Sequence, residues 1–290
     1  MRPWLELIRL PAVFTAPADV LAGLALAAFA GHATSPLIAV ALVLASAAVY
    51  CAGMAANDVF DAAIDASERP RRPIPSGRVS PAGAWMLIGG LQATALATGA
   101  WISPSALAAV GATIAATYLY NAVLKNTPVG PAAMGLCRYG NACIGLAPLG
   151  FGAPTWMLLI PLGTLAYVTA LTTVSRYEVD GATRAQLGGP FAAMFILAAT
   201  PAIWALGGWL PRPWAAAAVV LVWLWLIGPI RRAWSAPAAS SVRGVVMAGI
   251  YGIALINGAL ALAAGGDVYA AVAVGLLIPG RRFGRWFYAT

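Results

Sequence analysis

The sequence predicts an all-α, polytopic membrane protein. Of its 290 residues only 17 are lysine or arginine and 9 are aspartate or glutamate, while 61% are hydrophobic. A soluble domain carries about a quarter charged residues, so this chain cannot solvate a globular surface. Disorder is excluded as well, because it requires low hydrophobicity. The apolar runs are each about 20 residues long and do not alternate in polarity, which indicates membrane helices rather than barrel strands.

Nine apolar runs are long enough to cross a bilayer, and no loop between them is long enough for a second domain, so residues 1–290 should form a single domain. The expected spans are residues 10–30, 37–60, 81–101, 104–122, 131–150, 155–178, 186–207, 213–230 and 243–264. A tenth apolar piece, residues 268–279, is short for a full crossing. Residues 281–290 mix arginines with aromatic residues, which fits an anchor at the membrane interface.

Lysine and arginine gather in alternate loops, and of the opposite loops only the one containing Arg212 carries either residue. The positive-inside rule therefore predicts a multi-pass protein of the cell inner (plasma) membrane with a cytoplasmic N-terminus. The same rule explains the net charge of +8 without a nucleic-acid partner. The arginines at 281, 282 and 285 lie outside if there are nine crossings, and inside if residues 268–279 re-enter or cross.

An acidic stripe ends the second span. At about 100° per residue, four polar side chains fall within roughly a quarter-turn of a helix: Asn57, Asp58, Asp61 and Asp65. Carboxylates so close together repel one another unless something positive lies between them. Oxygen ligands of this kind suit Mg²⁺, which typically bridges one or two carboxylates to substrate phosphates. The alternative is a solvated helix end that happens to be acidic.

A basic loop follows the stripe at residues 68–80. Prolines stiffen it, and its arginines, which include Arg72 and Arg78, offer bidentate contacts to phosphate oxygens. Plain positive-inside charge is the simpler explanation of this loop, and the two explanations are compatible.

These motifs resemble those of the UbiA superfamily of intramembrane prenyltransferases. The resemblance rests on N-D-x-x-D-x-x-x-D at 57–65, R-P-I-P-S-G-R-V-S at 72–80 and Y-L-Y-N-A-V-L-K at 118–125. It implies a bundle of about nine helices around a central cavity that opens to lipid. It also implies that Mg²⁺ at the acidic stripe binds a prenyl diphosphate, whose ionisation gives an allylic cation. A lipid-soluble, electron-rich acceptor then attacks that cation, and membrane lipid surrounds the site.

The resemblance assigns roles to individual residues. Asp58, Asp61 and Lys125 become the expected catalytic residues. Lys125 also joins Arg72 and Arg78 in neutralising the leaving group, as the physical chemistry of phosphate departure requires. The rings of Tyr118 and Tyr120 are candidates for stabilising the cation. Oligomeric state is not implied.

The second acidic motif of the family is thinned in this chain. The three acidic positions align with Ser175, Glu178 and Ala182, so only Glu178 remains as a metal ligand. In one interpretation Glu178 holds a second metal alone, or one metal suffices and Arg176 or Arg184 supplies positive charge to the diphosphate. In the other, diphosphate chemistry is lost. Tyr177 and Asp180 are further candidates for the cavity, and the S-R-x-E-V sequence resembles the EboC-like branch of the family.

Three polar residues lie deep within expected spans: Asp19, Arg138 and Asn141. Ionisable groups at such depth are costly and usually face a cavity or a partner. We expect Arg138 and Asn141 to contact the diphosphate or the acceptor, while Asp19 either pairs with Arg138 or stays neutral against backbone. The rival functions are a non-catalytic or transport-linked protein on the same fold, and a membrane terpene cyclase.

Overall fold

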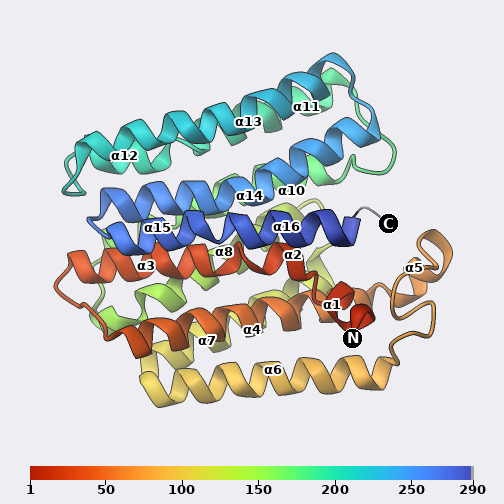
Figure 1. The fold of residues 1–290 in the computed structure, drawn as a ribbon, viewed down its shortest axis with the longest axis horizontal. Helices are drawn as coiled ribbons and strands as arrows, with labels where there is room; N and C mark the ends of the chain where they lie inside the picture. The colour runs from red at the N-terminus through yellow and green to blue at the C-terminus, as the bar shows by residue number, and fades with distance from the viewer. Residues whose placement is uncertain (289–290) are drawn as a thin grey trace.

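The computed structural model describes the backbone of residues 1–288 and the side chains of residues 1–284. Residues 1–288 contain helices and turns and no strand, so the predicted all-α class is confirmed. The long helices run side by side along one direction (Figure 1). Within the described part of the chain, eight segments are long and apolar enough to cross a membrane: Leu10–Phe29, Pro36–Phe60, Pro81–Ile102, Pro104–Leu124, Thr155–Ser175, Arg184–Leu206, Pro213–Ser235 and Ala239–Ala263.

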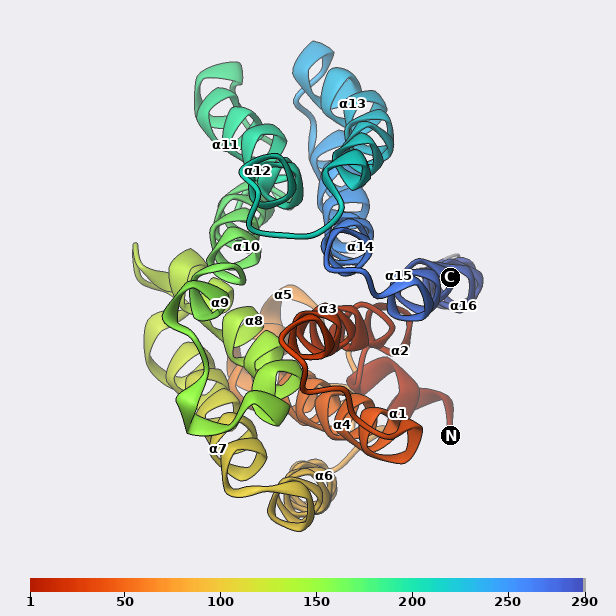
Figure 2. The same cartoon turned by 90° about the vertical axis from the view of Figure 1, so that its left-hand side faces the viewer.

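The remaining expected span, residues 131–150, is present as a shorter helix. It is α8 (Gly130–Leu146), which the 3₁₀ helix η2 (Ala147–Gly152) continues. Viewed along the bundle, α8 lies near the centre, between α3 (Ala16–Phe29) and α10 (Leu162–Ser175) (Figure 2). Protein surrounds α8 on several sides, so it need not be as long or as apolar as a helix that faces lipid.

Three spans begin where the sequence places a serine before a proline. Ser35, Ser80 and Ser103 each cap a helix, with the side-chain oxygen accepting a hydrogen bond from the backbone N–H three residues later. The following proline takes the first helical position, where no N–H is needed. These caps start α4 (Pro36–Phe60), α6 (Pro81–Ile102) and α7 (Pro104–Leu119). The helix starts are therefore set locally.

Glycines bring the backbones of α3 and α8 into contact. A Cβ atom on Gly145 would lie 2.2 Å from the Val20 carbonyl oxygen, and one on Gly23 would lie 2.7 Å from the Ala142 carbonyl oxygen. Small residues permit such close approach between membrane helices. The contact places the polar residues of α8 directly against α3.

A buried polar network forms at this contact. Asp19, fully buried on α3, accepts hydrogen bonds from Arg138 at 3.1 Å, from Asn141 at 2.9 Å and from Asn257 at 2.8 Å. Arg138 also donates to Thr15 Oγ1 at 2.9 Å. The ion pair between Asp19 and Arg138 is thus confirmed, and the network ties α3 and α8 to α14 (Ala239–Ala263).

The C-terminal segment runs along the bundle from one end to the other (Figure 1). Residues 268–279 fall in α15 (Asp267–Gly275) and α16 (Leu277–Tyr288), which run past α3 and back to the end where the chain begins (Figure 1). The Tyr251 hydroxyl donates to the Gly280 carbonyl at 3.2 Å and helps hold this segment to α14. Of the two alternatives for the tail, the structure supports the one that returns it to the N-terminal end. The side chains of residues 285–290, on which the expected interfacial anchor partly depends, lie outside the described residues.

Replacing Arg138 with methionine should destabilise the fold by about 3–5 kcal/mol, because Asp19 would keep a buried charge without its partner. The double variant Asp19→Asn/Arg138→Met should cost less than the sum of the two single changes. Unfolding of the purified protein in mixed detergent micelles measures all three. Asp267→Asn, which breaks the exposed Arg212 pair, is the control and should leave the midpoint nearly unchanged. If the destabilisation of the double variant equals the sum of the two single variants, Asp19 and Arg138 are not energetically coupled and the prediction is wrong.

Candidate functional site

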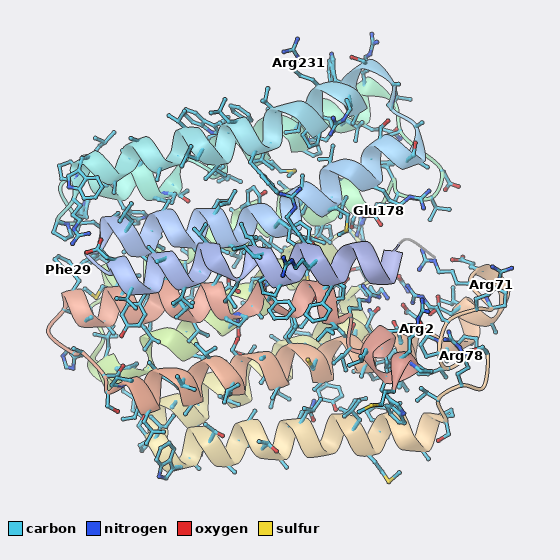
Figure 3. The ribbon with its side chains drawn as sticks, viewed as in Figure 1. Arg2, Phe29, Arg71, Arg78, Glu178 and Arg231 are labelled. Carbon is cyan, nitrogen blue, oxygen red and sulfur yellow. The ribbon has the colours of Figure 1, made fainter. Side chains whose placement is uncertain are left out.

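The predicted site residues gather mostly at one end of the bundle. This end contains α1 (Arg2–Leu7), the end of α4, α5 (Ala62–Glu68) and the basic loop. Arg2, Arg71, Arg78 and Glu178 lie here, whereas Phe29 lies at the opposite end (Figure 3). We call this end the cap.

The acidic stripe keeps its helical register through the turn between α4 and α5. The backbone N–H of Asp61 donates to the Asn57 carbonyl at 3.0 Å, and that of Asp65 donates to the Asp61 carbonyl at 2.8 Å. Asp58 and Asp65 are only 5% and 2% exposed. The stripe is therefore an inward face of the cap, and the solvated helix end that the sequence left open is not what forms.

Arg72 lies between two of these carboxylates. Its Nη1 atom is 3.2 Å from Oδ1 of Asp58 and 2.6 Å from Oδ2 of Asp65. Arg69 approaches the other oxygen of Asp65 at 3.8 Å. The carboxylates would repel one another without a cation between them, and the basic loop supplies that cation.

Arg9 also belongs to the site, although no sequence motif predicted a role for it. Its Nη2 atom lies 3.2 Å from Oδ1 of Asn57 and 3.4 Å from Oδ1 of Asp58. Arg9 has a φ of 50°, a left-handed conformation that is uncommon outside glycine and is found at functional sites. Its position just before Leu10-Pro11, at the break before the first span, was the available signal.

Asn121 was also missed. The Asn57 amide donates to Oδ1 of Asn121 at 2.9 Å, and the Asn121 amide donates to the Gly53 carbonyl at 3.3 Å. This chain of hydrogen bonds turns the amide oxygen of Asn57 toward Arg9. Asn121 stands within the Y-L-Y-N-A-V-L-K motif, so its presence beside Tyr120 was the signal.

Lys125 is brought to the stripe by a π-helical turn. Helix α7 continues into η1 (Tyr120–Leu124), and the Lys125 N–H donates five residues back to the Tyr120 carbonyl at 2.8 Å. Single π-turns inside helices are frequent at functional sites because they re-aim side chains. Here Lys125 forms an ion pair with Asp61.

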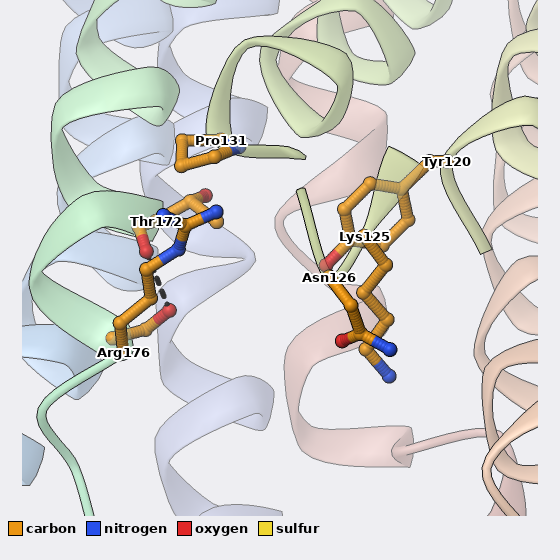
Figure 4. A pocket seen from close by; sticks show the side chains of 7 residues that line it. Tyr120, Lys125, Asn126, Pro131, Thr172 and Arg176 are labelled. Atoms are coloured by element: carbon orange, nitrogen blue, oxygen red, sulfur yellow. Dashed lines mark hydrogen bonds between the residues drawn. The ribbon is translucent and has the colours of Figure 1, made fainter. Parts of the chain in front are cut away.

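A pocket of about 360 Å³ opens beside Lys125 (Figure 4). It lies between η1, the start of α8 and the end of α10, and its lining residues are Tyr120, Lys125, Asn126, Pro131, Thr172, Ser175 and Arg176. Tyr120 is 8% exposed and lies within electrostatic reach of Arg9, Asp61 and Arg176. The pocket therefore joins the acidic stripe to the thinned second motif.

The second motif does not continue as a helix. Helix α10 ends at Ser175, residues 176–180 form turns, and Gly181 has a φ of +78°. The Arg176 guanidinium donates a hydrogen bond to the Thr127 carbonyl, outside the second motif. Asp180 is exposed, and Tyr177 packs against the apolar core around α10 and α14.

Glu178 is half-buried among cations. Burial raises the pKa of this carboxyl above its usual value, and the opposing influence of Arg243, Arg9 and Arg69 does not cancel it.

Other predicted residues lie away from the stripe. Arg78 pairs with Glu6 at 2.8 Å, and the Tyr118 hydroxyl donates to Gln92 at 3.2 Å. Arg138 and Asn141 belong to the network with Asp19. Arg138 lies seven residues beyond Pro131 on α8, about 10 Å deeper than the pocket.

The chemistry of the stripe fits a magnesium ion. Carboxylate and amide oxygens are the ligands that Mg²⁺ prefers, and Asn57, Asp58, Asp61 and Asp65 supply them. Protein cations contact these oxygens in this structure, and among the described residues no three His, Cys, Asp or Glu side chains are grouped closely enough to hold a metal. A metal at the stripe must therefore take the place of Arg72 or Lys125.

Arg72→Gln should lower the melting temperature by several degrees in EDTA, because Asp58 and Asp65 then repel each other. Magnesium should restore more of that loss than it adds to the unmodified protein, since the guanidinium no longer competes for the carboxylates. Thermal unfolding with and without Mg²⁺ measures both effects. Arg71→Gln, an exposed change one residue away, is the matched control. Equal magnesium shifts in both variants would refute this competition.

Comparison with known proteins identifies the family to which the chain is similar. The UbiA prenyltransferase family matches residues 19–242. The chain is 36% identical over 172 residues to a digeranylgeranylglyceryl phosphate synthase of Methanopyrus kandleri, covering 55% of this chain and 58% of that protein. It is 33% identical over 131 residues to the 33 kDa chain of bacteriochlorophyll synthase from Cereibacter sphaeroides, covering 43% of each. The chain thus spans between two fifths and three fifths of the length of these relatives.

A solved structure shares the fold. The UbiA homologue from Archaeoglobus fulgidus bound to DMAPP and Mg²⁺ superposes with a TM-score of 0.65 at 19% identity, covering 95% of this chain and 99% of that chain. Because the family match extends over well more than half of the sequence, the chain belongs to the UbiA prenyltransferase family.

Proposed function

We propose that this protein is a Mg²⁺-dependent prenyltransferase. It takes a prenyl diphosphate as donor and an electron-rich, lipid-soluble molecule as acceptor. The observation that carries the proposal is the inward acidic stripe, Asn57 to Asp65, faced by Arg72 and Lys125 at the mouth of an apolar bundle. The A. fulgidus homologue, whose structure contains DMAPP and Mg²⁺, supports this assignment.

The residues of the cap account for departure of the leaving group. In the proposed reaction the C–O bond of the allylic diphosphate breaks, and its electron pair leaves with pyrophosphate. Magnesium bound to Asn57, Asp58, Asp61 and Asp65 would act as a Lewis acid toward the phosphate oxygens. Lys125, Arg72 and Arg176 add positive charge at the same end and neutralise the departing anion.

The carbocation then needs protection and a partner. The ring of Tyr120, buried beside the pocket, offers a face to the cation. The apolar bundle excludes water, which would otherwise capture the cation. The acceptor supplies the electron pair of the new bond and loses a proton. Relatives named for a glyceryl phosphate lipid and for bacteriochlorophyll are consistent with a lipid-soluble acceptor.

We further propose that residues 1–290 act as one domain in the inner (plasma) membrane, with the N-terminus and the cap in the cytoplasm. The support is the distribution of basic residues. The loops at the opposite end include residues 30–35, 103, 153–154, 207–212 and 264–266, and Arg212 is the one lysine or arginine in them. Such an asymmetry is typical of the cytoplasmic preference of lysine and arginine.

Asp61→Asn should reduce pyrophosphate release at least about a hundredfold, because it removes a metal ligand and releases Lys125 from its ion pair. The assay combines purified protein, Mg²⁺ and prenyl diphosphates of several lengths, with and without a lipid extract as the source of acceptor. Asp267→Asn, at the opposite end of the bundle, should leave release unchanged.

Two outcomes would overturn the proposal. The first is no pyrophosphate release with any chain length, together with no thermal stabilisation by diphosphate and Mg²⁺. This pair of results favours a non-catalytic or transport-linked role. The second is release that does not require an acceptor and yields a ring-closed hydrocarbon, which identifies a terpene cyclase.

A further inference from the structure

The pocket beside Lys125 is rich in hydrogen-bond donors and has no carboxylate in its lining. Lys125 and Arg176 provide two cations on opposite walls, one from the turn after η1 and one from the end of α10 (Figure 4). Tyr120, Thr172 and Ser175 add hydroxyl groups, and Asn126 adds an amide. A lining of this kind suits an anion with several oxygens, such as a phosphate group.

Arg176 is held in position by the backbone. Its guanidinium donates to the Thr127 carbonyl and so spans from the end of α10 to the turn after η1. One contact of this kind leaves other N–H groups of the guanidinium for a ligand. The cation is therefore placed by the fold rather than by a carboxylate that would cancel its charge.

The acidic groups around the pocket do not form a second metal site. Asp61 is engaged by Lys125, and the half-buried carboxyl of Glu178 faces Arg243, Arg9 and Arg69. A divalent ion at Glu178 would have one carboxylate and three nearby cations, and the like charges would repel it. The electrostatics of this side of the cap favour an anion.

We propose that this pocket is a metal-free phosphate subsite, in which Arg176, Lys125 and the hydroxyls of Thr172 and Ser175 bind the terminal phosphate of the donor directly. A single magnesium ion at the acidic stripe then suffices for the diphosphate. This inference rests on the proposed function, because it concerns how the same substrate is bound. It assigns to protein side chains the charge that a second metal would otherwise supply.

The first test is equilibrium binding of inorganic pyrophosphate in EDTA, measured by calorimetry on the full chain in detergent. The unmodified protein should bind it, and Arg176→Gln should weaken binding about tenfold, as expected for one charged hydrogen bond. Arg184→Gln is the matched control, because Arg184 also donates to a backbone carbonyl, that of Trp234 at 2.9 Å, but lies outside the pocket. Equal affinities of the Arg176 and Arg184 variants overturn the proposal, provided both melt as the unmodified protein does.

The second test counts metal ions. Mn²⁺ replaces Mg²⁺, an unreactive prenyl thiolodiphosphate replaces the donor, and electron paramagnetic resonance measures bound Mn²⁺. One ion per chain is expected, and two ions overturn the inference. Ser175→Asp, which places a carboxylate in the pocket beside Glu178, should raise the number toward two and reduce pyrophosphate binding in EDTA.

The two proposals fail in different ways. Turnover with two bound ions, unaffected by Arg176→Gln, leaves the prenyltransferase assignment standing and removes the metal-free subsite. Pyrophosphate binding in EDTA that depends on Arg176, without any turnover or any Mn²⁺ bound with the analogue, leaves the anion subsite and removes the prenyltransferase assignment.

Discussion

Charge compensation within the protein is the constraint on which this structure depends. Lipid cannot solvate an ion, so an ionised group inside the bundle must find its partner there. Asp19 pairs with Arg138 in the centre, and at the cap Asp61 pairs with Lys125. Arg72 joins Asp58 and Asp65. Each pair connects segments far apart in the sequence or a helix to its following loop, so neutralising the charges also fixes the arrangement of helices.

The cations that neutralise the acidic stripe have a second role at the cap. Arg72 and Lys125 neutralise the acidic stripe in this structure, and they are also the groups that a diphosphate requires. On the proposed function, the carboxylates would hold a metal in place of these cations, and Arg72 and Lys125 would then be free to contact the phosphates. The divalent ion and the diphosphate would largely offset each other's charge, so binding would add little unpaired charge at the edge of the bilayer.

Sequence patterns predicted those features that local chemistry determines. Apolar runs of about 20 residues predicted most of the membrane helices, and helical periodicity predicted the acidic stripe. Arg9, Asn121 and the pairing of Arg78 with Glu6 were not predicted, because each depends on which segments meet in space. The sequence also did not determine whether the C-terminal segment returns to the N-terminal end, because its apolar stretch is short. Contacts with α2 (Leu10–Val13), α3 and α14 hold it in place.

The two sides of the cap differ in charge, and under the proposed function this difference distinguishes the two phosphates of a diphosphate bound between them. On the side of α4 and α5 the ligands are oxygens, which require a metal to bridge them to phosphate. On the side of α10 the pocket lining offers Arg176 and hydroxyls, which in the proposed subsite bind phosphate directly. Thinning of the second acidic motif therefore need not remove diphosphate chemistry. It changes which cation carries the charge, from a metal ion that must be recruited to a guanidinium that Thr127 already positions.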